Sequence, residues 1–185
     1  MRYYTKKKTF LYEERDEQAR AEFIEELKVI ESQPIVYIDE SGIKNNMKNE
    51  YGRSLRGTVI MDDKKGHSTE KLNIIAGLLN NKLIAPLTYR CSTDTLVFNT
   101  WLEQCLIPVL PTKSIIIMDN ASFHKSDKTR HIIEQYGHRL LFLPAYSPDL
   151  NPIEQYWAII KAKIKKSIST YSDLCSCVEF VFKTI

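Results

Sequence analysis

The sequence has 185 residues, of which 43% are hydrophobic and 26% are charged, so its apolar content is sufficient for one globular core. Six glycines and seven prolines exclude a collagen-like or low-complexity chain. The net charge of +3 permits nucleic-acid binding without requiring it. Lysines cluster at residues 6–8 and 161–166, a pattern that fits a solvated surface as well as a nucleic-acid contact.

Membrane insertion and a disulfide framework are not expected. No apolar run approaches the ~18 residues that a membrane span requires, and no apolar stretch follows the basic N-terminus. The four cysteines, at positions 91, 105, 175 and 177, form no C-x-x-C pair, and no histidine pair has zinc-finger spacing. We therefore expect a soluble, cytoplasmic protein with free thiols and no membrane partner.

The first half of the chain is predicted to contain one helix followed by several strands. Apolar residues at helical spacing predict a helix over residues 14–32, which Pro34 ends. The apolar run 35–38 predicts a buried strand with Asp39 at its C-terminal end. The polar segment 44–57 is predicted to be a loop or an exposed hairpin. Further strands are predicted at residues 58–61, 72–79 and 82–89.

The second half alternates between helices and strands. Periodic apolar residues predict a helix over residues 94–110, which Pro108 ends or kinks. Residues 114–118 form the clearest predicted strand, and Asp119 follows it. Next come a helix that Ser126 caps and Gly137 closes, a strand over 139–143, a proline-rich turn and a last long helix. Because the strands are continuously apolar, both faces of their sheet should be covered, which predicts an α/β fold.

Three acidic residues stand where these elements begin or end. Asp39 and Asp119 each follow an apolar strand, and ligands of open α/β sheets gather beyond such strand ends. Glu154 lies beside the apolar face at the start of the last helix. Three converging carboxylates suit Mg²⁺ or Mn²⁺. Two such ions about 3.5–4 Å apart can promote phosphoryl transfer.

Each acid also has a purely structural interpretation. An aspartate after a strand is a common turn residue. Asn151 fits a helix N-cap, Pro152 the first helical position and Glu154 the third, so Glu154 could complete a capping box. A carboxylate that folds back onto its own helix end cannot also bind a cation. The residue pattern alone leaves both roles of Glu154 open.

Three segments resemble a known family. VYIDESG, IIIMDNASFHKS and LLFLPAYSPDLNPIEQYWAIIK resemble the three acidic motifs of DDE transposases, in the bacterial insertion-sequence branch of the mariner-like superfamily. The 34 residues between Asp119 and Glu154 are typical of members that end in glutamate. The resemblance extends through YGRSLRGT, LNIIAGLLNNKLIAPL and FNTWLEQCLIPVL. It implies a ribonuclease H-like fold, with a mixed five-stranded sheet and helices on both faces.

The resemblance also implies a reaction and its partners. Asp39, Asp119 and Glu154 would be the catalytic residues and would bind two Mg²⁺ or Mn²⁺ ions. The protein would cleave the ends of a mobile element and join them to target DNA, acting as a homodimer in the bacterial cytoplasm near the nucleoid. Further residues are candidates for orienting the site or contacting DNA: Asn120, His124, Arg53, Arg56, Lys161 and Lys165.

The expected domain organisation is a basic arm and helix over residues 1–33, followed by the catalytic domain over residues 34–185. Full-length members of the family usually carry helix-turn-helix domains ahead of the catalytic core, and no such domain is expected here. The chain would then be the catalytic portion alone, with a helix-turn-helix part encoded separately, or a truncated copy. A nuclease that cuts without joining and an inactive remnant that binds only DNA or a partner are the alternatives.

Overall fold

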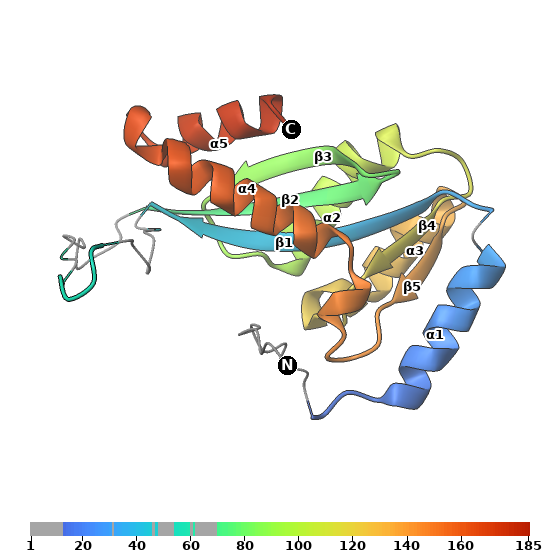
Figure 1. Ribbon diagram of the computed structural model, residues 1–185. Helices are drawn as coiled ribbons and strands as arrows, with labels where there is room; N and C mark the ends of the chain where they lie inside the picture. Colours follow the sequence, from blue (N-terminus) through green and yellow to red (C-terminus); the bar gives the residue numbers. More distant parts are fainter. Residues whose placement is uncertain (1–12, 31, 46, 48–53, 60, 62–69) are drawn as a thin grey trace, which may run out of the picture.

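A mixed five-stranded sheet organises the fold (Figure 1). The computed structural model describes residues 13–30, 32–45, 47, 54–59, 61 and 70–185. The strand order is β3-β2-β1-β4-β5, with β1 parallel to β4, β4 parallel to β5, and the β1–β2 and β2–β3 pairs antiparallel. The strands are β1 (Ile35–Lys44), β2 (Lys71–Leu79), β3 (Lys82–Tyr89), β4 (Ile115–Met118) and β5 (Arg139–Phe142).

Helices cover both faces of this sheet, as predicted. One face carries α1 (Glu17–Ile30), α4 (Ile153–Ser167) and α5 (Leu174–Lys183), and Figure 1 shows α4 crossing β1 with α5 beside it. The other face carries α2 (Thr95–Trp101) and α3 (Asp127–Gln135). In β4, Ile115 and Ile117 pack with α1, whereas Ile116 and Met118 pack with α2 and α3. This double burial explains why β4 is apolar at every position.

Local sequence signals account for most helix and turn boundaries. The Asp94 side chain accepts a hydrogen bond from the Val97 amide at the start of α2, and Ser126 caps α3 in the same way through Thr129. Directly after α2, the chain continues as a π-helix (Leu102–Leu106) and then a 3₁₀ turn (Ile107–Val109), which contains Pro108. Asn80 and Asn81 both have positive φ and form the two-residue turn between β2 and β3.

Three features differ from the sequence-based expectations. The predicted strand over residues 58–61 is wrong, because Thr58, Val59 and Met61 are exposed and lie outside any strand, while residue 60 lies outside the described residues. β1 continues to Lys44 instead of ending near Asp39. Its second half alternates in burial and pairs with β2, so its polar residues do not end the strand.

The third difference is α5, which follows the predicted last helix. Asp173 caps it by accepting a hydrogen bond from the Ser176 amide. Its apolar face recurs at helical spacing and packs on α4 and the sheet through Leu174, Cys177, Val178 and Val181. Within the described residues, no helix has the length and apolarity that crossing a membrane requires.

Close packing around Gly77 of β2 yields a first prediction. A Cβ atom there would lie 3.0 Å from Leu106 Cδ1 and 3.1 Å from both Ile84 Cγ1 and Val36 Cγ1. Gly77→Ala should therefore lower the free energy of unfolding by about 1–3 kcal/mol, measured by urea denaturation. Gly42→Ala is the matched control, because its nearest contacts would be 3.5 and 3.7 Å, and it should cause no comparable loss. Equal effects of the two substitutions would contradict the packing argument.

Candidate acidic site

The parallel pairing of β1 with β4 places two aspartates next to one another in the sheet. The ladder ends at the pair Tyr37–Ile117, and Asp39 and Asp119 each follow two residues later. Because side chains alternate along a strand, each aspartate continues the face to which Tyr37 and Ile117 belong, and α1 and α4 cover that face. The two carboxylates therefore leave neighbouring strands on the same side.

An open pocket of about 520 Å³ contains both aspartates and Glu154. Glu154 reaches it from the first turn of α4, and the segment between β5 and α4 forms much of the remaining wall. Asn120 and Asn151 also line this pocket. Arg20 of α1 anchors this wall, because its guanidinium makes two hydrogen bonds of 3.0 and 2.7 Å to the Asp149 carboxylate.

Asp39 is the most strongly perturbed acid of the pocket. Burial raises its pKa most, the charges of Glu154 and Glu40 raise it further, and the result is a pKa of about 7. Trp157 Nε1 donates a 2.9 Å hydrogen bond to Asp39 Oδ2, which opposes the shift and fixes the carboxylate against α4. Negative charge is thus concentrated around Asp39 and unfavourable there.

Asp119 experiences the opposite environment. His124 Nδ1 lies 2.7 Å from its Oδ1, and the Ala121 amide donates to the same oxygen at 2.9 Å. The hydrogen bond from His124 is the main reason that the pKa of Asp119 is lowered from its usual value. Asp119 accepts both of these hydrogen bonds through Oδ1. Asp119 is therefore held as a carboxylate.

His124 connects Asp119 to Glu40. Its Nε2 lies 3.1 Å from Glu40 Oε1, so each ring nitrogen faces a carboxylate and both can donate only in the imidazolium form. Burial alone lowers the pKa of His124, but the two carboxylates outweigh that effect and raise it to about 9. The ring is 0% exposed and packs on Phe98 and Phe123, with ring centroids 4.4 and 4.3 Å away. A buried cation thereby links β1 to the segment after β4.

The start of α4 has the backbone, but not the side-chain contacts, of the proposed capping box. Asn151 is extended, Pro152 is helical, and the Asn151 carbonyl accepts a hydrogen bond of 3.2 Å from the Glu154 amide. Within the part of the chain that the structure describes, no side-chain cap bond forms there, and the buried Asn151 Oδ1 has no hydrogen-bond partner. The capping-box interpretation of Glu154 is therefore wrong, since its carboxylate is exposed and lines the pocket instead.

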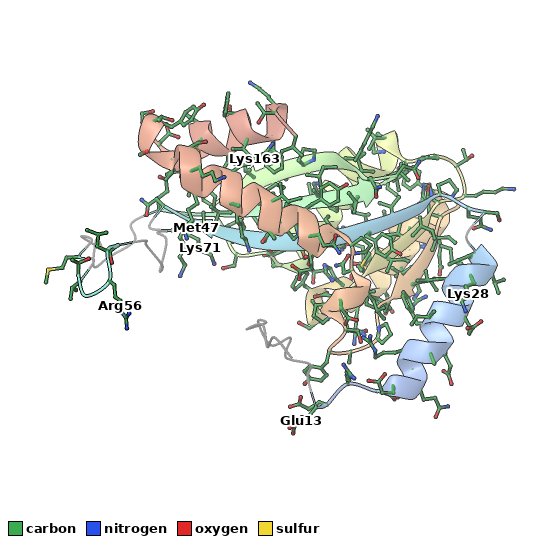
Figure 2. The ribbon with its side chains drawn as sticks, in the orientation of Figure 1. Glu13, Lys28, Met47, Arg56, Lys71 and Lys163 are labelled. Carbon is green, nitrogen blue, oxygen red and sulfur yellow. The ribbon has the colours of Figure 1, made fainter. Side chains whose placement is uncertain are left out.

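The other candidate residues lie at different distances from this pocket. Asn120 lines it, and its Nδ2 donates a 2.6 Å hydrogen bond to the Leu143 carbonyl. Lys161 and Lys165 are partly buried on α4 beyond the lining residues. Arg56 is exposed and Figure 2 shows it away from the sheet and helices, while Arg53 lies outside the described residues. The structure therefore gathers Asn120 and His124 with the three acids, and not the lysines or Arg56.

The donor set fits a hard divalent cation. All three acids offer carboxylate oxygens, which Mg²⁺ and Mn²⁺ prefer. A cation would stabilise the charge of Asp39, which burial and the charges of Glu154 and Glu40 make unfavourable. Among the residues described by the structure, however, no three histidine, cysteine, aspartate or glutamate side chains are grouped closely enough to hold one ion. Binding would require the Glu154 side chain and its neighbours to draw together.

The family can now be assigned. The sequence model of the DDE superfamily endonucleases matches residues 34–175, which is most of the chain. The chain belongs to the DDE superfamily of endonucleases. The predicted family resemblance is thus confirmed, while the bacterial insertion-sequence branch stays a prediction.

Several known proteins similar to this DDE endonuclease are transposases. The Tc3 transposase of Caenorhabditis elegans is 41% identical over 58 residues, which are 31% of this chain and 18% of the relative. The match to the Mos1 strand transfer complex has a TM-score of 0.68 at 16% identity, and it covers 100% of this chain and 64% of the Mos1 chain. The match to the Mos1 mariner catalytic domain has a TM-score of 0.62 at 15% identity, and it covers 95% of this chain and 83% of the Mos1 chain.

These similarities confirm the predicted ribonuclease H-like fold. In a Mos1 paired-end complex with the left transposon end, the match covers 88% of this chain and 53% of that one, with a TM-score of 0.67 at 17% identity. The chain thus spans roughly half of that transposase and a smaller part of the curated relative.

Two residues that influence the acids of this DDE endonuclease, Glu40 and Trp157, were not predicted from the sequence to belong to the site. Glu40 follows Asp39 directly in β1, and adjacent strand residues point to opposite faces of the sheet. His124 contacts the Glu40 carboxylate on that opposite side, and the charge of Glu40 also raises the pKa of Asp39. Trp157 is a buried core residue of α4, and its hydrogen bond to Asp39 crosses 118 residues of sequence. Neither contact has a local sequence signal.

The His124 bridge should be important for stability. His124→Ala leaves Glu40 and Asp119 without their shared donor and creates a cavity between two phenylalanines. We expect the free energy of unfolding to fall by about 2–4 kcal/mol in urea denaturation. His131→Ala is the control, because His131 is exposed on α3 and should change stability by less than about 0.5 kcal/mol. Equal losses for both variants would contradict this account.

The burial of Asp39 and the charges around it lead to a second stability prediction for the site, in which the substitution should stabilise the fold. Its pKa is raised from 3.8 to about 7, so the folded state binds a proton that the unfolded state releases, and stability falls as pH rises through this interval. Asp39→Asn removes the charge and can still accept the Trp157 hydrogen bond. We expect the variant to be more stable than wild type by about 2–3 kcal/mol at pH 8 in EDTA. The difference should vanish near pH 4, and a less stable variant at pH 8 would contradict it.

Proposed function

We propose that this chain contains the catalytic domain of a DNA transposase that cleaves the ends of a mobile element and transfers them to target DNA. The observation that carries the proposal is the shared pocket of Asp39, Asp119 and Glu154. Their placement on β1, after β4 and at the start of α4 also accounts for the 34-residue interval between the last two acids. Family membership and similarity to the Tc3 and Mos1 transposases support it.

Asp39, Asp119 and Glu154 would hold Mg²⁺ or Mn²⁺, with two ions per site. When bound, the ions would activate the attacking oxygen and stabilise charge on the leaving oxygen at phosphorus. Two of the similar Mos1 paired-end complexes were determined with Mn or Mg. Support within this chain comes from its oxygen donors and from the repulsion around Asp39, which a cation would relieve.

The residues of the chain contribute mainly by positioning. Trp157 directs one oxygen of Asp39, and His124 with the Ala121 amide directs one oxygen of Asp119, leaving the second oxygen of Asp119 for a metal. Glu154 is exposed at the pocket and is the acid with the greatest freedom to move inward. This division gives the site two fixed carboxylates and one adjustable carboxylate.

The proposed partners are transposon ends, target DNA and a second copy of this chain, with the reaction taking place in the cytoplasm on nucleoid DNA. The Mos1 structures include paired-end and strand transfer complexes, which supports the DNA partners. The boundary between residues 1–33 and 34–185, the homodimer and a separately encoded helix-turn-helix part stay predictions. So do DNA contacts by Arg53, Arg56, Lys161 and Lys165.

The proposal is tested with Glu154→Gln, which retains side-chain size and loses the charge. Cleavage of a labelled DNA carrying the flanking inverted repeats should require Mg²⁺ or Mn²⁺ and should fall by at least about a hundredfold in the variant. Glu103→Gln is the matched control, because Glu103 is exposed on the π-helix that follows α2, and it should cleave as wild type does. Mg²⁺ should also raise the melting temperature of wild type and of Glu103→Gln more than that of Glu154→Gln.

The products separate the proposal from its alternatives. Joined products on a supercoiled target support a transposase, whereas cleavage without joining indicates a nuclease of the same fold. Stabilisation by Mg²⁺ without cleavage by wild type would favour an inactive remnant with an intact metal site. Unimpaired cleavage by Glu154→Gln would remove Glu154 from the site.

A further inference from the structure

A second pocket lies beside the acidic one and shares Asn120 with it. Its volume is about 300 Å³, and its wall includes Lys125, Arg130 and Phe142. Asn120 stands at the boundary, because it also lines the acidic pocket and its amide is tied to the Leu143 carbonyl. Asn120 is thus the residue that the two pockets share.

The two pockets have opposite charge. Lys125 and Arg130 are both exposed at the second pocket, and the charge of Lys125 contributes to lowering the pKa of Asp119. The Lys125 ammonium therefore acts electrostatically on the acidic pocket while lining its neighbour. The ion pair of Arg130 with Glu134 is 3.7 Å long and solvent-exposed, so it holds the guanidinium only weakly.

This arrangement matches the charge pattern of a DNA strand at a metal-dependent site. The reacting phosphate needs cations bound among carboxylates, but the neighbouring phosphates keep their charge and need protein cations. Lysine and arginine are the side chains that contact such phosphates most often, and arginine can bind two oxygens at once. An acidic pocket directly beside a basic one provides both environments.

We propose that Lys125 and Arg130 bind a backbone phosphate of the DNA strand whose neighbouring phosphate reacts at the acidic pocket. The inference rests on the proposed function and adds the second pocket as a subsite for the strand. Ser126 also lines this pocket, but its hydroxyl already caps α3 through the Thr129 amide and is not assigned to the phosphate. Because phosphate contacts are independent of base sequence, this subsite would position the strand without selecting its sequence.

The test compares three substitutions that each remove one positive charge. Lys125→Gln and Arg130→Gln alter the pocket, whereas Lys128→Gln removes an exposed lysine of α3 that does not line it. DNA affinity is measured by fluorescence anisotropy with a labelled short duplex, in EDTA, from about 50 to about 200 mM salt. Circular dichroism and melting temperature verify that each variant is folded.

The slope of log affinity against log salt should fall by about 0.9 for each pocket variant and remain unchanged for Lys128→Gln. Arg130→Lys should retain the slope, because it keeps the charge. Equal effects of Lys128→Gln and the pocket variants would show that only overall charge matters and would overturn the proposal. Unchanged slopes in the pocket variants, or a wild type without salt-dependent DNA binding, would also overturn it.

The outcome is separable from that of the cleavage test because EDTA excludes the metal-dependent reaction. Reduced slopes together with absent cleavage would retain the phosphate subsite and remove the transposase proposal. Normal cleavage with unchanged slopes would retain the transposase and remove the subsite.

Discussion

The parallel register of β1 and β4 is the constraint on which the candidate site depends. It places Asp39 and Asp119 two residues beyond the same paired position, on the face that α4 covers. The adjacent Glu40 then lies toward the opposite face, where His124 reaches it from the segment after β4. A shift of one residue would exchange these faces and separate Asp39 from both Asp119 and Trp157. Burial of β4 on both sides makes such a shift costly, since all four of its residues are buried.

The two aspartates of the pocket are controlled in different ways. Asp119 accepts hydrogen bonds from an imidazolium and a backbone amide, so its carboxylate is favourable and its pKa is lowered. Asp39 is mostly removed from solvent and faces the charges of Glu154 and Glu40, so its charge is unfavourable and its pKa is raised. Cation binding would be favoured mainly by the environment of Asp39, because a bound cation relieves the repulsion between negative charges there. Without metal, the unfavourable charge of Asp39 makes the folded protein less stable than the same fold would be without that charge.

Much of the fold could be predicted from the sequence, because its elements carry local signals. The apolar runs of β1 and β4, the caps Asp94 and Ser126, and the periodic faces of α1 and α4 act within a few residues of chain. The extension of β1 past Asp39 depends on pairing with β2 and has a weaker, alternating signal. The cap and apolar face of α5 were visible in the sequence, although no helix was predicted there. The contacts of His124 and Trp157 arise only from tertiary structure.

The neighbouring pockets indicate how one small domain can bind both the reacting phosphate of a DNA strand and the phosphate next to it. Carboxylates alone would repel a phosphate, and lysines or arginines among them would neutralise the acids and hinder cation binding. Separate placement avoids this conflict, with Asp39 and Glu154 on one side of Asn120 and Arg130 on the other. His124 lies between the two regions, lines the basic pocket and holds Asp119 of the acidic one. Movement of the η3 segment (Ser122–Lys125) would consequently change both pockets together, since it carries His124 and Lys125.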